Sequence, residues 1–95
     1  MNHIPYGYYI DGGVAKVDEP AAKIIRALFT EFIECKSMRA AAMKIGLNKA
    51  HATLGRIISK RVYLGTDFYP QIIDEEVFNK ANEIKLQNAI AQNRI

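Results

Sequence analysis

The sequence predicts a mainly helical α+β fold, in which an N-terminal β-hairpin is followed by about four helices that include a helix-turn-helix. Three observations lead to this prediction: an Asp-Gly-Gly turn between two β-prone runs, a broad apolar stripe in the first helical segment, and a Gly-Leu-Asn corner between two later helical segments. The chain has 95 residues, of which 49% are hydrophobic. Such a chain forms one small domain with a single core.

A β-hairpin is expected at residues 4–17. The bulky run IPYGYYI precedes Asp11-Gly12-Gly13, and Val14 and Val17 follow it. Glycine tolerates the positive φ angles of tight hairpin turns, so this tripeptide between two β-prone runs favours a hairpin. Pro5 lies at the start of the first strand, where its missing N–H costs least.

A core helix is expected at residues 20–35. Asp18 is placed to cap it, and Pro20 fits the first turn because no N–H donor is needed there. The segment carries apolar residues at three- and four-residue spacing, which forms a broad stripe for burial. The stripe consists of Ile24, Ile25, Leu28, Phe29, Phe32 and Ile33.

Residues 37–60 have the layout of a helix-turn-helix. Ser37 is expected to cap the first of the two helices, and Gly46 to end it in the left-handed conformation. Leu47 is expected to be a buried corner residue, and Asn48 to cap the second helix. In such a unit the second helix enters the DNA major groove and the first crosses the backbone.

A short strand is expected at residues 62–69. The sequence VYLGTDFY is aromatic and β-branched, as strands often are. Gly65 marks a turn or bulge in it, and Pro70 breaks it because proline cannot donate to a sheet ladder.

The last helix is expected to begin at Glu75. Ile73 and Phe78 occupy the positions of a hydrophobic staple, which fixes the start of a helix. Beyond residue 86 the apolar periodicity decays, so residues 87–95 are expected to be a frayed helix or a linker. The predicted domain therefore spans residues 1–86.

Positive charge is concentrated in one segment. Residues 36–61 contain seven lysines and arginines and no acidic residue, whereas the whole chain has a net charge of only +3. A basic block of this density is an electrostatic footprint for a polyanion. The alternative is the solvated face of two lysine-rich helices, and charge alone does not separate the two.

The basic block and the helix-turn-helix together predict that the helix at 49–60 binds double-stranded DNA. Arg56 is expected to contact guanine O6 and N7, while Thr53 and His51 meet base edges or phosphates. Four cations at the helix flanks suit phosphates: Lys44, Lys49, Lys60 and Arg61. Arg39 completes the set of DNA-binding candidates.

No catalytic site is predicted. Ser37 and Ser59 lack the arginine-rich surroundings that strand cleavage by serine requires, and His3 and His51 lie in different elements. A single cysteine, Cys35, excludes an internal disulfide and a zinc site, so we expect no metal and no cofactor. No apolar run approaches the roughly 20 residues of a membrane span, and no signal peptide is visible, so we expect no membrane partner. The lone cysteine is typical of a thiol in a reducing compartment, which favours the cytoplasm.

Five successive stretches resemble the recombinase domain of large serine recombinases, the resolvase/invertase-type integrases and transposases. They are IPYGYYIDGG, VDEPAAKIIRALFTEF, SMRAAAMKIG, ATLGRIISKRVYLG and PQIIDEEVFNKANEI, in that order, and the resemblance covers about residues 3–86. It implies a domain that recognises half of an attachment site or transposon end, with residues 50–60 as the DNA-reading helix. It also implies that a separate catalytic resolvase domain, in the same or another chain, cuts the DNA.

The chain departs from the family pattern at several places. Arg61-Val62 stands where Pro-Ala is usual, Gly55 replaces a residue that is often basic, and a Gly-rich insertion before the DNA-reading helix is missing. The cysteine-rich zinc ribbon that usually follows is absent as well. We therefore expect either an excised piece of a larger recombinase or a truncated orphan of one.

Two other functions fit the same residues. One is a stand-alone helix-turn-helix transcriptional regulator, which would bind a palindrome as a dimer. The other is a helical protein-interaction domain that no longer binds DNA. The target sequence and the oligomeric state do not follow from the residues.

Overall fold

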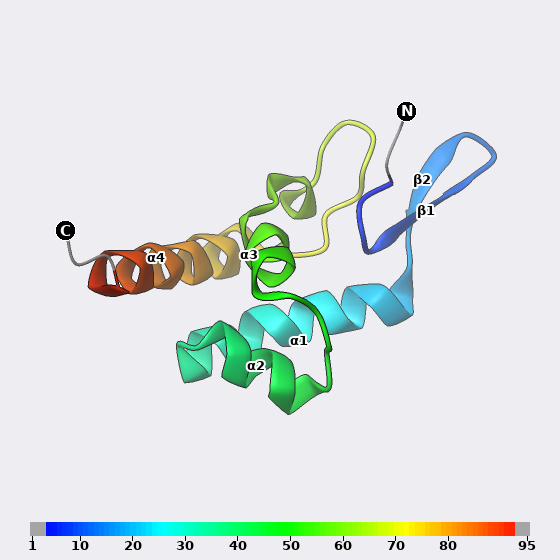
Figure 1. Cartoon of the computed structure of the whole chain (residues 1–95). Helices are drawn as coiled ribbons and strands as arrows, with labels where there is room; N and C mark the ends of the chain where they lie inside the picture. Colours follow the sequence, from blue (N-terminus) through cyan, green and yellow to red (C-terminus); the bar gives the residue numbers. More distant parts are fainter. Residues whose placement is uncertain (1–3, 93–95) are drawn as a thin grey trace.

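The structure, a computed structural model, describes residues 4–92 as an antiparallel hairpin followed by four α-helices, which confirms the predicted mainly helical α+β fold. In Figure 1 the hairpin projects from a helical body in which α2 lies against α1 and α4 runs away from the hairpin. In chain order the elements are β1 (Tyr8–Asp11), β2 (Val14–Val17), α1 (Glu19–Cys35), α2 (Met38–Ile45), α3 (His51–Ser59), the 3₁₀ helix η1 (Arg61–Leu64) and α4 (Glu75–Gln92).

The hairpin forms where the Asp-Gly-Gly turn predicted it. β1 and β2 pair from Tyr8 opposite Val17 to Asp11 opposite Val14. The turn places its two glycines at φ angles of 60° and 78°, a region that costs glycine little and other residues much more. On the inner face Tyr8 and Ala15 are buried, so the base of the hairpin is part of the core.

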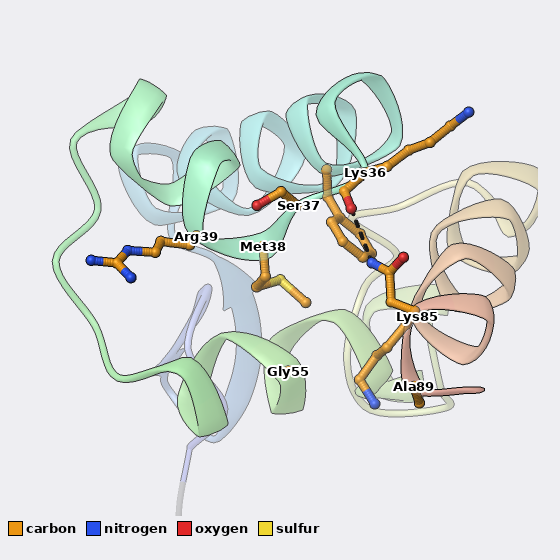
Figure 2. A pocket seen from close by; sticks show the side chains of 9 residues that line it. Lys36, Ser37, Met38, Arg39, Gly55, Lys85 and Ala89 are labelled. Carbon is orange, nitrogen blue, oxygen red and sulfur yellow. Dashed lines mark hydrogen bonds between the residues drawn. The ribbon is translucent and has the colours of Figure 1, made fainter. Parts of the chain in front are cut away.

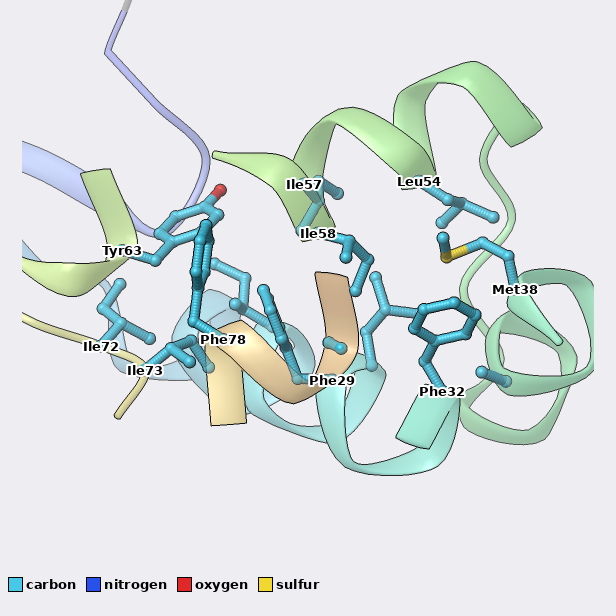
Figure 3. Close-up of a cluster of buried hydrophobic side chains, with 14 of the residues drawn as sticks. Phe29, Phe32, Met38, Leu54, Ile57, Ile58, Tyr63, Ile72, Ile73 and Phe78 are labelled. Atoms are coloured by element: carbon cyan, nitrogen blue, oxygen red, sulfur yellow. The ribbon is translucent and has the colours of Figure 1, made fainter. Parts of the chain in front are cut away.

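Helix α1 is the central helix of the core, as its apolar stripe predicted. Proline stands in its first turn, and Asp18 occupies the N-cap position, although its side chain makes no capping hydrogen bond. The predicted stripe is buried at four positions, Ile25, Leu28, Phe29 and Phe32, whereas Ile24 and Ile33 are only half-buried. Figure 3 shows Phe29 and Phe32 pointing from α1 toward side chains of the later helices.

The predicted strand at residues 62–69 is wrong. The chain instead forms η1 and then an irregular loop, and the sheet described in residues 4–92 has only two strands. The reason is Tyr63, which is completely buried and whose carbonyl oxygen accepts hydrogen bonds from the amides of Ile72 and Ile73 at 2.9 Å. Burying this ring requires the chain to turn inward, so tertiary packing overrides the β propensity of the segment.

Three aromatic rings, Tyr8, Tyr63 and Tyr69, form what we call the tyrosine cluster. The ring centroids of Tyr8 and Tyr63 are 6.1 Å apart, and those of Tyr8 and Tyr69 are 4.9 Å apart. The Tyr63 hydroxyl donates a hydrogen bond to the carbonyl oxygen of Tyr6 at 2.7 Å. The Tyr8 hydroxyl donates one to the carbonyl oxygen of Pro70 at 2.6 Å. These bonds join the hairpin to the segment between α3 and α4.

Helix α4 begins at Glu75, as the hydrophobic staple predicted, and Ile73 and Phe78 are both buried. The Asn82 side chain donates hydrogen bonds of 2.9 Å to the carbonyls of Ile58 and Phe78, which ties α4 to α3. The helix continues to Gln92, so the described part of the predicted tail is helical, and residues 93–95 lie outside the described part.

Candidate nucleic-acid interface

Helices α2 and α3, with the turn between them, form what we call the α2–α3 unit (residues 38–59). Ser37 caps α2 as predicted, because its hydroxyl accepts a hydrogen bond from the amide of Ala40 at 3.2 Å. Gly46 ends the helix at a φ angle of 74°, and the Leu47 amide bonds to the Ala42 carbonyl at 2.8 Å. Ala41 and Ala42 are buried, so small side chains face the helices that α2 contacts.

The start of α3 differs from the prediction. Its N-cap residue is Ala50, which has no capping side chain, and Asn48 is exposed in the turn rather than at the cap. Leu47 is only half-buried, although it packs against the core as a corner residue should. Because Ala50 has no side chain that can cap the helix, the first-turn amides of α3, which lack intrahelical partners in any helix, receive no capping hydrogen bond from the N-cap residue.

Helix α3 has one buried face and one open face. Leu54, Ile57 and Ile58 are buried, and Figure 3 shows them directed toward α1 and α4 side chains. Arg56 is exposed on the opposite side, and Thr53 is half-buried at the edge. The buried face therefore fixes the position of α3 in the core, and the opposite face presents the Arg56 cation to solvent.

Two small residues that the sequence reasoning did not select share this open face. Ala52 and Ser59 are exposed, and together with Gly55, Arg56 and Lys85 they line a hollow of about 340 Å³. Small side chains next to a cation allow a helix backbone to approach a flat or grooved partner closely. Their spacing from Arg56, about one helical turn on either side, is the sequence signal that could have identified them.

The flanking cations have different environments. Lys49 and Arg61 are exposed and lie over aromatic rings, with Lys49 Nζ 5.3 Å from the Tyr6 centroid and Arg61 Cζ 5.7 Å from the Phe78 centroid. Contacts of this kind hold a cation at the surface without neutralising it. Lys60, the C-cap residue of α3, is exposed beside Arg61.

Lys44 is the one predicted phosphate ligand that has an acidic partner among the described residues. Its Nζ lies 3.1 Å from Oε1 of Glu31 on α1. The hydrogen bond and charge of Glu31 raise the pKa of Lys44 above its ordinary value. The basic block is therefore partly neutralised at this position, because α1 brings to it a carboxylate that is distant in sequence.

Arg39 lies apart from Lys44, at the other end of α2. It is exposed and borders two hollows, one beside α4 and one of about 400 Å³ that also includes Met43, Leu47 and Lys49. Figure 2 shows its guanidinium extending away from α2 toward solvent.

The side chain of His51, the remaining predicted DNA-binding residue, lies outside the described part of the structure.

The structure thus brings together most of the predicted cations on and around the α2–α3 unit. Within residues 4–92, no three side chains of the metal-ligating types gather in one place, and none of the helices has the length and apolar character needed to cross a membrane.

The fold is similar to that of a solved large serine recombinase (LSR) in an LSR–DNA complex. The superposition has a TM-score of 0.77 at 20% sequence identity and covers 90% of this chain. This chain spans only 31% of the recombinase chain. No protein-family model and no curated protein matches the sequence. At this identity the likeness establishes a shared fold.

Proposed function

We propose that this chain is a double-stranded DNA-binding domain of a site-specific serine recombinase system, and that α3 reads half of an attachment site or transposon end. The observation that supports this most strongly is the open face of α3, which carries Arg56 on a fold similar to part of a recombinase bound to DNA. The domain has no catalytic role of its own in this proposal. Strand exchange belongs to a separate serine catalytic domain, and the system operates in the cytoplasm.

The α2–α3 unit acts as a helix-turn-helix in this proposal. The major groove is about 12 Å wide, which accommodates one helix with its side chains. Arg56 is the base-reading residue, since arginine pairs with guanine O6 and N7 through two hydrogen bonds. Thr53, at the edge of the open face, contacts a base edge or a phosphate, and so does His51.

The remaining cations anchor the backbone. Lys49, Lys60 and Arg61 are exposed at the two ends of α3, where the phosphates of a bound duplex pass. Arg39 contributes from α2. Lys44 is the weakest of these anchors, because binding a phosphate means leaving Glu31.

Selection from randomised duplexes tests this function. The purified chain is incubated with a pool of DNA duplexes at moderate salt, and bound molecules are sequenced over several rounds. The proposal predicts convergence on one asymmetric half-site, bound by a monomer. Recovery of a palindrome bound by a dimer would instead favour a transcriptional regulator, and no enrichment together with no duplex binding would favour a protein-interaction domain.

A further inference from the structure

Two hollows meet where α3 passes α4. The larger, of about 440 Å³, extends from Arg39 to Lys85, and the smaller, of about 340 Å³, contains Arg56. Gly55 and Lys85 line both, so the two hollows adjoin at these residues, and we call them together the α3–α4 trough. The trough runs along the side of the proposed DNA-reading helix.

Lys85 reaches into this trough from α4. It is half-buried, and a Cβ atom added to Gly55 would lie 3.5 Å from Lys85 Cε, so its aliphatic stem passes over the α3 backbone. Figure 2 shows Lys85 directed from α4 toward α3, while Arg39 stands at the opposite rim. Lys36 also borders the trough, but its side chain extends away from it in the same view.

No acidic side chain is among the described residues that line the trough. Neither Arg39 nor Lys85 belongs to an ion pair found in residues 4–92, in contrast to Lys44. Unpaired cations on two rims of an acid-free depression raise the local concentration of anions. Gly55, without a side chain, leaves room for the Lys85 stem to pass close to the α3 backbone.

We propose that Lys85 is a phosphate-positioning residue, and that one strand of the DNA backbone lies along the α3–α4 trough between Lys85 and Arg39. This inference rests on the proposed function, because a helix in the major groove is flanked by a phosphate backbone on each side. In this arrangement Lys49, Lys60 and Arg61 contact phosphates at the two ends of α3, and the trough contacts the phosphates along its side. The assignment adds α4 to the DNA-binding surface.

A matched pair of lysine variants on α4 tests the assignment. Lys80 is exposed and lines neither hollow, and at 3.6 residues per turn it lies about 140° around the helix from Lys85. Affinity for a fluorescent duplex is measured for Lys85→Gln, Lys80→Gln and the unaltered chain between 50 and 200 mM salt. Thermal unfolding of each variant is followed in parallel.

Removal of one phosphate contact makes the slope of log K against log salt shallower by about 0.9. Between these two salt concentrations, the affinity deficit of Lys85→Gln should therefore shrink about threefold. Lys80→Gln should keep the original slope, and Lys85→Arg should restore most of the affinity because it restores the cation. This pattern would support the assignment even if Lys85→Gln lowers the melting temperature.

Three outcomes would overturn it: equal slopes for the two glutamine variants, an unchanged slope in Lys85→Gln, or no rescue by Lys85→Arg. If Arg56→Ala weakens binding in the same assay while Lys85→Gln does not, the inference fails and the proposed function survives. If the unaltered chain binds no duplex at low salt, the proposed function fails as well.

Discussion

The tyrosine cluster and the α2–α3 unit are held together by different interactions. In the cluster, side-chain hydroxyls bond to carbonyls more than 50 residues away, as in the pairs Tyr63–Tyr6 and Tyr8–Pro70. In the α2–α3 unit, the Ser37 cap and the Gly46 turn are local, and only one face of α3 is packed. We therefore expect stability to depend mainly on the first region, and the proposed DNA binding to depend on the open face of the second.

Truncation of Tyr63 should have the largest effect. Tyr63→Ala removes a completely buried ring and its hydrogen bond, and is expected to lower the free energy of unfolding by about 3–5 kcal/mol. Tyr63→Phe keeps the ring and should cost about 1 kcal/mol. Urea denaturation measures both.

Tyr9→Ala is the matched control, because Tyr9 is 46% exposed on β1 and its truncation should change stability by less than about 1 kcal/mol. Similar losses for Tyr9→Ala and Tyr63→Ala would contradict the assignment of stability to the cluster.

Substitutions of the exposed cations of the α2–α3 unit should affect binding and leave stability almost unchanged. Arg56→Ala is expected to reduce the preference for the selected site over random DNA by about 1–3 kcal/mol. Lys49→Ala should weaken binding to every duplex similarly, because a phosphate contact carries no sequence information. Competition binding with selected and random duplexes separates the two effects, and equal losses on both duplexes for both variants would remove the base-reading role of Arg56.

Alkaline pH should weaken the tyrosine cluster selectively. Burial, followed by the charge of Tyr69, raises the pKa of Tyr8 to about 12, and burial also raises the pKa of Tyr63. An unfolded tyrosine titrates near pH 10, so stability is fully present below about pH 10 and is lost as pH rises toward the folded pKa.

Each of these tyrosines can contribute up to about 1.4 kcal/mol of lost stability per pH unit in that window. Tyr8→Phe should therefore show a smaller decrease between about pH 10 and 12 than the unaltered chain. Denaturant midpoints measured across this range check the prediction, and parallel pH profiles for the two proteins would contradict it.

Two glycines of the α2–α3 unit should respond in opposite directions. Gly46→Ala places a side chain at a φ angle of 74° and should cost about 1 kcal/mol. Gly55→Ala improves helix propensity by about 1 kcal/mol, and its Cβ would make only ordinary contact with Lys85 at 3.5 Å. Melting temperatures should therefore fall for the first variant and rise for the second, and a decrease for Gly55→Ala would show that this position is more tightly packed than the contact implies.

Local signals predicted much of the fold. The Asp-Gly-Gly hairpin, the stripe of α1, the Ser37 cap, the Gly46 turn and the start of α4 all depend on residues close together in the sequence. The strand at 62–69 could not be excluded in the same way. The segment does not form a strand because Tyr63 is buried against the hairpin, and this contact between distant residues is seen only in the folded chain.

The candidate site shows the same limit. The basic segment and the exposed Arg56 were predictable, but the Lys44–Glu31 pair joins two helices and was not visible in a charge count by segment. Lys85 lies far from the basic block in sequence and reaches α3 only through the packing of α4. The DNA contacts themselves stay predictions.

The salt dependence of duplex binding tests the central claim most directly. Affinity is measured by fluorescence anisotropy over a range of salt concentrations, and log K is plotted against log salt. The account predicts a straight line whose slope is about −0.9 for each phosphate that the exposed cations contact, so several contacts give a steep decline. Absence of binding at low salt, or binding with a slope near zero, would contradict it.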